Sequence, residues 1–339
     1  MKTEILTENE AERAGEILRR GGLVAIPTET VYGLAANALD GEAVSGIFRA
    51  KGRPMDNPLI VHIAETEELE PLVKEVPEKA FKLMERFWPG PLTIIMPKSD
   101  IIPDEVSAGL DTVAIRMPSH PVARKVLKCA GIPLAAPSAN TSGKPSPTTA
   151  EHVYRDLDGK IDAIVDGGPC DVGVESTVIT LCSEVPRLLR PGRVTPEELA
   201  SVLGDIEVDD AVLHPLKEGA VVRSPGMKYK HYSPAADVIV VSGSLPDFRE
   251  YVNRMAEENK GKTAALVFEG EEKGINCETL SFGRKDSDEE HANRLFGALR
   301  KTDEMGIDTV YVRCPSAEGV GLAVMNRLLR AAEFRVIEL

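Results

Sequence analysis

The chain has 339 residues, of which 42% are hydrophobic and 28% charged, and its formal net charge is −14. This length and composition allow a full hydrophobic core and predict two domains. No apolar run approaches the roughly 20 residues of a membrane-spanning helix, so we expect no membrane span and a cytoplasmic location. The five cysteines are scattered without a CxxC pair, which argues against a zinc site or a disulfide framework.

The first part of the chain has a mixed α/β pattern. Its opening 20 residues predict an acidic amphipathic helix and not a signal peptide. Short apolar runs with the character of strands follow, separated by amphipathic helices. The predicted strands are 22–28, 58–64, 91–98, 112–118, 132–140, 161–168, 176–181 and 186–192. The predicted helices are 41–51, 77–88, 120–131 and 195–204, the last with a capping box between Thr195 and Glu198.

The pattern becomes regular after a segment that contains proline and glycine. Strands are predicted at 237–243, 262–270, 277–283 and 308–315, and helices at 245–261, 289–306 and 319–334. Strands that alternate with helices indicate a parallel α/β domain. The sequence therefore predicts an α/β protein with a first domain at 1–205, a linker at 206–235 and a smaller C-terminal domain at 236–339.

The segment KGRPMDNPLIVHI, residues 51–63, joins a helix to a buried strand. Pro54 disfavours the helical region for Arg53, so we expect the preceding helix to stop and the chain to extend. In an extended chain Lys51 and Arg53 point to the same side, and two such cations repel unless an anion lies between them. The segment thus predicts an anion site, with a solvated loop as the alternative. His62 lies in the strand that follows, and a single histidine in such a strand is more often structural than catalytic.

Arg116 is a second candidate for binding an anion, because it lies in the apolar strand DTVAIRMP. Alternation places it on one face with Thr112 and Ala114. An arginine is costly to bury unless it is paired, and residues 112–150 contain no Asp or Glu. A bound carboxylate or phosphate is therefore one expected partner, and a distant acidic side chain is the alternative.

Hydroxyl and amide side chains gather at other strand ends. The loop APSANTSGKPSP carries Ser138, Asn140 and Ser146 inside the acid-free stretch, where hydroxyl and backbone N–H groups can converge on phosphate. A plain Ser/Pro turn is the alternative. No nucleophile–base pair stands out, which favours a reaction driven by positioning and charge neutralisation. The residues alone thus predict an anionic, nucleotide-like ligand.

Taken together, these stretches resemble the YrdC-like threonylcarbamoyl-AMP synthases. The matching motifs are PTETVYGL, KGRPMDNPLIVHI, FWPGPLT, VAIRMPSHP, APSANTSGKPSPT, ESTV and LLRPG. The tail SPGMKYKHYSP and the second α/β region are similar to the long, two-domain form. The resemblance implies a YrdC-like mixed twisted sheet with flanking helices and a concave basic cavity, followed by a Rossmann-like parallel domain.

The resemblance also implies a reaction and partners. L-threonine and bicarbonate or CO2 would give N-carboxy-threonine, which attacks the α-phosphate of ATP and expels pyrophosphate. Threonylcarbamoyl-AMP would then pass to a tRNA threonylcarbamoyl transferase complex. Mg²⁺ is expected to arrive on the phosphates, since the sequence offers no carboxylate cage. The acidic surface leaves direct tRNA binding open.

Residue roles follow from the same resemblance. The expected catalytic residues are Lys51, Arg53 and Arg116. L-threonine would be bound by Thr30, His62, Arg116, Ala136 and Ser176. ATP would be bound by Arg53, Asn57, Thr112, Ser138, Asn140, Ser146, Arg190 and Tyr232. Tyr229, His231 and Tyr232 of the linker would cover the nucleotide.

Two other function classes compete with this interpretation. A non-catalytic protein could hold double-stranded RNA in the basic concavity, although 22 basic against 30 acidic residues up to Gly204 argue against it. An acyl- or carbamoyl-transferase acting on a substrate like carbamoyl phosphate would form no product linked to AMP. Pyrophosphate release with and without threonine and bicarbonate separates the three.

Overall fold

The computed structural model describes residues 2–215 and 232–339, so the roles expected of Tyr229 and His231 lie outside the described residues. The chain forms two compact units. Of the described residues, the first unit contains 2–142 and 146–212, and the second contains 143–145, 213–215 and 232–339. The predicted domain boundary at residue 205 stays a prediction. Residues 206–212, the start of the predicted linker, lie in the first unit.

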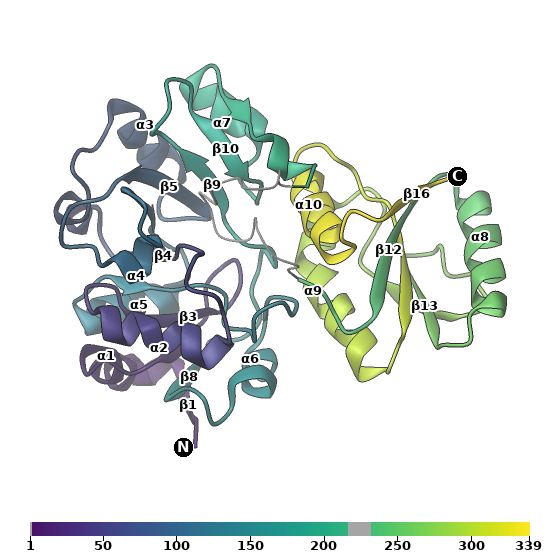
Figure 1. The fold of residues 1–339 in the computed structure, drawn as a ribbon, viewed down its shortest axis with the longest axis horizontal. Coiled ribbons are helices and arrows are strands. Elements are labelled where there is room, and N and C mark those ends of the chain that lie inside the picture. Colours follow the sequence, from purple (N-terminus) through teal and green to yellow (C-terminus); the bar gives the residue numbers. More distant parts are fainter. Residues whose placement is uncertain (1, 216–231) are drawn as a thin grey trace. The chain divides into compact units, whose positions relative to one another are not determined.

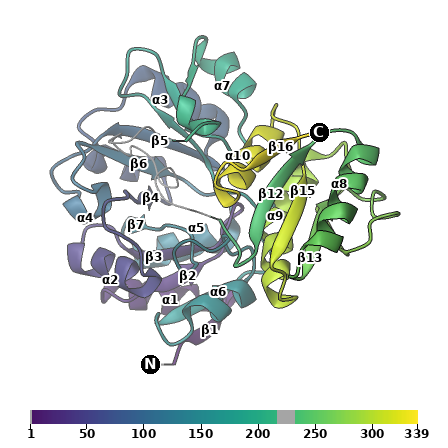
Figure 2. The same cartoon turned by 45° about the vertical axis from the view of Figure 1, so that its right-hand side comes forward.

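The first unit is built on a mixed sheet of 11 strands in the order β1-β8-β2-β3-β7-β4-β6-β5-β9-β10-β11. Figure 2 shows its central strands following one another from β2 to β5. The strands are β1 (Glu4–Thr7), β2 (Val24–Ile26), β3 (Gly33–Asn37), β4 (Ile60–His62), β5 (Leu92–Pro97), β6 (Thr112–Arg116), β7 (Leu134–Ala135), β8 (Ala163–Asp166), β9 (Thr177–Thr180), β10 (Arg187–Arg190) and β11 (Glu207–Val208).

Helices cover both faces of this sheet (Figure 1). They are α1 (Ala11–Arg19), α2 (Gly41–Lys51), α3 (Glu78–Phe87), α4 (Asp104–Ser107), α5 (Pro121–Ala130), α6 (Ala150–Leu157) and α7 (Pro196–Leu203). Strand β2 shows how alternation divides the core. Val24 and Ile26 pack in the cluster that contains α1 and α5, whereas Ala25 packs in the larger cluster that contains α2 and α3.

The second unit is a parallel sheet of five strands in the order β14-β13-β15-β12-β16. The strands are β12 (Asp237–Ser242), β13 (Thr263–Val267), β14 (Glu278–Ser281), β15 (Thr309–Arg313) and β16 (Val336–Glu338), and the helices are α8 (Leu245–Glu258), α9 (Asp288–Glu304) and α10 (Gly321–Ala331). Val241, Ala265 and Tyr311 pack against Phe248 and Val252 of α8. The predicted fold class, a mixed α/β sheet followed by a parallel α/β unit, is confirmed.

Several local predictions need correction. The expected N-terminal helix is wrong over residues 4–7, because β1 pairs there in parallel with β8 and the helix begins only at Ala11. Strand β3 was missed because GLAAN has weak strand propensity, and its place is set by pairing between β2 and β7. Helix α6, capped by Thr149, and edge strand β16 were also missed.

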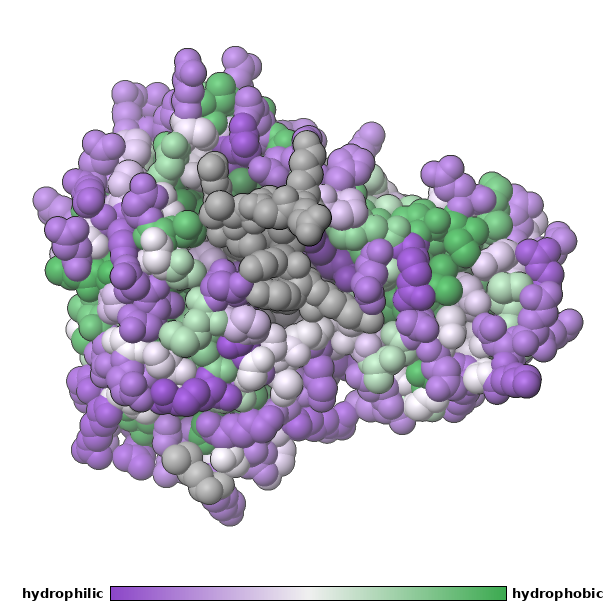
Figure 3. All heavy atoms as spheres, in the orientation of Figure 1, coloured by the Kyte–Doolittle hydropathy of each residue, from purple (hydrophilic) through white to green (hydrophobic). Residues whose placement is uncertain are grey.

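Other local signals are confirmed. Helix α2 has the predicted bounds, and the capping box of Thr195 and Glu198 forms at α7. Polar and charged side chains cover most of the face seen in Figure 3. In the part of the chain that the structure describes, no helix is long and apolar enough to cross a membrane.

Candidate active site

A row of polar side chains crosses the middle of the first sheet. His62 of β4 lies opposite Arg116 of β6, and Arg116 lies opposite Thr93 of β5. Directly paired residues face the same side of a sheet, so the three side chains share one face. The Thr93 Oγ1 atom lies 2.8 Å from the Oγ atom of Ser176, which immediately precedes β9. The row thus spans four neighbouring strands.

Alternation explains why this face is polar at one end. Two residues before His62 and Arg116, the same face carries Ile60 and Ala114, which pack in a small apolar cluster with Ile95. The opposite face of the same strands packs into the main core of the unit. The predicted shared face of Ala114 and Arg116 is therefore confirmed.

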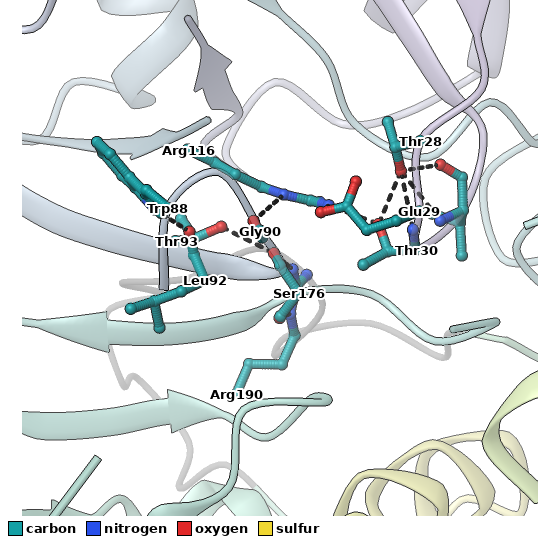
Figure 4. Close-up of polar contacts among 11 residues, drawn as sticks. Thr28, Glu29, Thr30, Trp88, Gly90, Leu92, Thr93, Arg116, Ser176 and Arg190 are labelled. Atoms are coloured by element: carbon teal, nitrogen blue, oxygen red, sulfur yellow. Dashed lines mark hydrogen bonds and ion pairs between the residues drawn. The ribbon is translucent and has the colours of Figure 1, made fainter. Parts of the chain in front are cut away.

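Arg116 is buried and makes three kinds of contact (Figure 4). Its Nη2 atom lies 2.6 Å from Glu29 Oε1, its Nη1 donates to Thr30 Oγ1 at 2.9 Å, and its Nε donates to the Gly90 carbonyl at 3.3 Å. The structural alternative for Arg116, a distant acidic partner, is thus realised by Glu29. The arginine is held in place before any ligand arrives.

The loop after β2 fixes the direction of these hydrogen bonds. Thr28 Oγ1 donates its proton to the Val31 carbonyl at 2.6 Å. Since Thr28 has no second proton, the 2.8 Å contact between the two hydroxyls must be donated by Thr30. The Thr30 oxygen, which already accepts from Arg116, can therefore offer a ligand only an acceptor.

Glu29 is a charged residue that the sequence reasoning did not select. Its side chain is 8% exposed, and neither carboxylate oxygen has a hydrogen-bond partner that meets normal geometry, although the ion pair to Arg116 is short. Burial raises the pKa of the Glu29 carboxyl, but the charge and contact of Arg116 outweigh burial and hold the pKa below its ordinary value. Glu29 is therefore an anion in this structure.

His62 is neutral at physiological pH. Burial, followed by the positive charge of Arg116, lowers its pKa to about 3. Its Nδ1 lies 3.1 Å from the Ile60 carbonyl oxygen. A neutral imidazole that bonds to its own strand can shape a site and accept or donate a hydrogen bond, but it adds no charge.

Arg190 at the end of β10 meets the other end of the polar row. Its Nε donates to the Ser176 carbonyl at 3.0 Å and its Nη2 to Ser176 Oγ at 3.1 Å. Ser176 was expected to bind threonine and Arg190 to bind nucleotide. Their direct contact brings the two predicted subsites together.

Lys51 lies where a helix ends. The expected extended geometry is wrong, because Lys51 is the last residue of α2 and Gly52 adopts a left-handed φ of 61° before Arg53. The buried Lys51 Nζ donates to the carbonyls of Ser138 and Asn140, each at 2.5 Å. Lys51 therefore anchors the Ser138 loop through backbone oxygens.

The Ser138 loop is ordered by its own side chains as well. Ser138 Oγ donates to Asn140 Oδ1 at 2.6 Å, so Asn140 helps to order the loop. Farther along the loop, the buried Ser146 hydroxyl donates to a carboxylate oxygen of Glu175. Both predicted hydroxyls thus have partners within the protein.

Asn57 is buried without a hydrogen-bond partner for either amide atom. The Nη2 atom of the neighbouring Arg53 donates to the backbone carbonyl of Asn57 at 3.2 Å. Buried polar groups in folded proteins are nearly always paired, so this amide is available to bind a ligand. This observation favours a binding role more strongly than the loop's sequence did.

The remaining predicted residues are placed as follows. Thr112 opens β6, and Ala136 follows β7, where its N–H donates to the Ile60 carbonyl at 2.9 Å. Tyr232 lies in the second unit, stacked on Phe296 with ring centroids 5.3 Å apart and with Arg327 over its ring. The structure leaves the nucleotide role of Tyr232 as a prediction.

Sequence reasoning missed Glu29, Thr93 and Glu175. Thr93 lies in a predicted strand, but only the pairing of β5 with β6 places it beside Arg116. Glu29 stands inside PTETVYGL, and an acid between two threonines just after a strand was a usable signal.

Comparisons with known proteins identify the family of this chain. A Sua5/YciO/YrdC family model described as telomere recombination matches residues 16–192. A second family model, described as threonylcarbamoyl-AMP synthase, C-terminal domain, matches residues 194–333. The threonylcarbamoyl-AMP synthase of Pyrococcus abyssi is 49% identical over 334 residues, which cover 96% of this chain and 94% of that protein. The Bacillus subtilis enzyme of the same name is 48% identical, over 99% of this chain and 97% of its own.

Solved structures give the same result. Pyrococcus abyssi Sua5 complexed with L-threonine is 46% identical, with a TM-score of 0.92 over 99% of this chain and 100% of that one. Escherichia coli YciO is 25% identical with a TM-score of 0.51, over 56% of this chain and 96% of its own. The two family models and the near full-length relatives show that the chain belongs to the threonylcarbamoyl-AMP synthase family, in the form that carries a Sua5 C-terminal domain.

Proposed function

We propose that this protein makes threonylcarbamoyl-AMP and pyrophosphate from L-threonine, bicarbonate or CO2, and ATP, for a downstream tRNA threonylcarbamoyl transferase. The observation that carries the proposal is a set of three unsatisfied buried groups in the first unit. The Asn57 amide has no partner, and neither the Glu29 carboxylate nor Arg116 Nη2 completes a hydrogen bond of normal geometry. Such groups in a folded protein call for a ligand that completes them.

Arg116 would bind the carboxylate of L-threonine. Its guanidinium is oriented in advance by Thr30 and the Gly90 carbonyl, so little side-chain entropy is lost on binding. Thr30 would accept a hydrogen bond from the threonine hydroxyl, Ser176 would offer its hydroxyl to that group or to the carbamate, and His62 and Ala136 would line the same subsite. The solved complex of the Pyrococcus abyssi relative with L-threonine supports L-threonine as the substrate.

ATP would lie along the Ser138 loop and the end of β10. Arg53 and Arg190 would neutralise phosphate charge, while Asn57, Thr112, Ser138, Asn140 and Ser146 would supply hydrogen bonds to the nucleotide. Lys51 supports the nucleotide subsite by holding the loop carbonyls of Ser138 and Asn140.

The proposed reaction then has two steps. The threonine ammonium group gives up one proton, its nitrogen forms a bond to the carbon of CO2 as one C–O π bond opens, and a second proton leaves to water, giving a carbamate that keeps one N–H. A carbamate oxygen forms a bond to the α-phosphorus of ATP as the bond to the β-phosphate oxygen breaks, and pyrophosphate leaves. Fixed cations stabilise the charge that grows on the phosphates in this step.

Mg²⁺ would enter with ATP, because phosphate oxygens and water suit this hard cation. Among residues 2–215 and 232–339, no group of three or more His, Cys, Asp or Glu side chains is arranged to hold a metal ion. The phosphates would therefore supply the ligands, and Arg53 and Arg190 would share the charge with the metal.

The test is a pyrophosphate-release assay with ATP alone, with threonine, with bicarbonate and with both. The proposal predicts release only when both additions are present. Release that ignores threonine and bicarbonate would refute it. Tight, salt-dependent binding of double-stranded RNA without any such release would favour the RNA-binding alternative instead.

A further inference from the structure

Glu29 gives Arg116 a negative neighbour inside the site where the carboxylate of threonine is proposed to bind. We propose that Glu29 recognises the α-ammonium group of the amino-acid substrate, so that Arg116 and Glu29 together bind the zwitterion. The inference rests on the proposed function, because it takes Arg116 as the carboxylate-binding group. It assigns a substrate-binding role to a residue that neither the motif comparison nor the periodicity of the sequence selected.

The first argument is charge complementarity. An α-amino acid carries one negative and one positive group on the same carbon, so its binding site needs two opposite charges side by side. Arg116 Nη2 and Glu29 Oε1 lie 2.6 Å apart, and both side chains are less than 10% exposed. A cation alone would attract any small carboxylate, whereas this pair also binds the ammonium group and so favours an amino acid.

The second argument is that the pair is incomplete as it stands. Buried ion pairs gain little unless further hydrogen bonds satisfy their remaining atoms. Neither oxygen of Glu29 accepts a hydrogen bond of normal geometry, and Arg116 Nη2 donates none. A bound zwitterion supplies what is missing, since its ammonium group donates to Glu29 and its carboxylate accepts from Arg116.

The third argument is that the backbone holds Glu29 at this place. Thr28 Oγ1 accepts from the N–H groups of Thr30 and Val31, each at 3.2 Å, and so closes a tight turn around Glu29. Thr30 then ties the turn to Arg116. Glu29 also lines a recess of about 430 Å³, which Arg116 does not line. The two charges are thus fixed to one another.

A simpler interpretation is that Glu29 only neutralises Arg116 in the empty site. The two interpretations differ in what happens to ligands without an amino group. A pure counter-ion competes with every carboxylate ligand, so its removal strengthens or weakens the binding of all of them alike. An ammonium-binding residue discriminates between L-threonine and its α-hydroxy analogue, in which a neutral hydroxyl replaces the amino group.

The experiment measures the dissociation constants of both ligands by calorimetry on the full-length protein and on Glu29→Gln. The wild type should prefer L-threonine over the α-hydroxy analogue by about tenfold to a hundredfold, the value of one charge-assisted hydrogen bond. In Glu29→Gln that preference should fall to within about threefold, while binding of the analogue changes little. Glu65→Gln, which removes an exposed carboxylate that pairs with Lys128, is the matched control and should keep the wild-type preference.

The inference is overturned if the affinity of Glu29→Gln falls by the same factor for both ligands, or if the variant binds both ligands more tightly than the wild type does. If Glu29→Gln does not fold, Glu29→Asp replaces it: the shorter acid should keep a reduced preference for L-threonine, and an unreduced preference would contradict the assignment. Failure of the proposed function would look different, because wild-type pyrophosphate release would then be independent of threonine whatever Glu29 does.

Discussion

Replacing Arg116 with alanine should destabilise the first unit as well as impair threonine use. The substitution removes the guanidinium that lies 2.6 Å from Glu29 and leaves a buried carboxylate without a counter-charge. Three contacts of Arg116, to Glu29, Thr30 and Gly90, disappear together. The effect on stability can be measured without any substrate.

The magnitude follows from the burial of the pair. Removing one partner of a buried ion pair costs about 3–5 kcal/mol. In the wild type, Arg116 keeps the pKa of Glu29 below its ordinary value. The ion pair therefore stabilises the fold at any pH above that ordinary pKa, and this stabilisation is lost as the pH falls. In Arg116→Ala, burial raises the pKa of Glu29 and only the backbone N–H groups of Glu29 and Ser119 still oppose it, so the variant should lose stability as pH rises. The difference in unfolding free energy should therefore be larger at about pH 8 than at about pH 5.

Trp88 provides the assay, because it is the chain's single tryptophan and lies in the first unit. It is buried, and its Nε1 donates to the Leu92 carbonyl at 2.7 Å. Urea unfolding followed by its fluorescence thus reports on the unit that holds Arg116. The double variant Glu29→Gln with Arg116→Met should recover most of the lost stability, since no charge is left unpaired. Equal stability of Arg116→Ala and wild type, or a double variant no better than the single one, would refute the reasoning.

Three further predictions concern other residues of the site. Lys51→Met should cost about 1.5–3 kcal/mol in urea unfolding and raise the KM for ATP more than that for threonine, because Nζ holds the carbonyls of Ser138 and Asn140. Asn57→Ala should raise the KM for ATP about tenfold while the unfolding free energy changes by less than about 1 kcal/mol, since its amide has no partner to lose. His62, with its pKa lowered to about 3, should lower stability as pH falls from about 6.5, by up to about 1.4 kcal/mol per pH unit, and His62→Gln should remove this dependence.

Each of these has a result that contradicts it. Arg49→Met, on the exposed face of the same helix, is the control for Lys51 and should change neither KM, so an equal effect of the two variants would exclude the anchoring role. A large loss of stability in Asn57→Ala with unchanged ATP kinetics would make Asn57 a structural residue. An acid-side stability curve of His62→Gln that matches the wild type would show that His62 is not held neutral.

Local sequence signals predicted the parts of this site that lie within one strand or loop. The periodicity of β6 put Ala114 and Arg116 on one face, and the small cluster with Ile60 confirms it. The absence of acids around Arg116 pointed to a partner from elsewhere. The alternation of β4 and the hydroxyl-rich loop at Ser138 were likewise visible in the sequence, since side-chain direction in a strand follows from its period of two.

What sequence reasoning could not supply was the register between strands. Thr93 becomes a neighbour of Arg116 only because β5 pairs with β6 in one register, and Glu29 reaches it from a loop far away along the chain. The orientation of Lys51 was misjudged because the chain from Lys51 to Arg53 was taken as extended, whereas Lys51 is still helical and Gly52 follows it in a left-handed conformation.

The most direct measurement is mass spectrometry of the nucleotide products formed from ATP, L-threonine and carbon-13-labelled bicarbonate. The account predicts an adduct of AMP that contains both threonine and the labelled carbon, made by the wild type and lost in Arg116→Ala. Pyrophosphate release without such an adduct, or an adduct that lacks the labelled carbon, would contradict it.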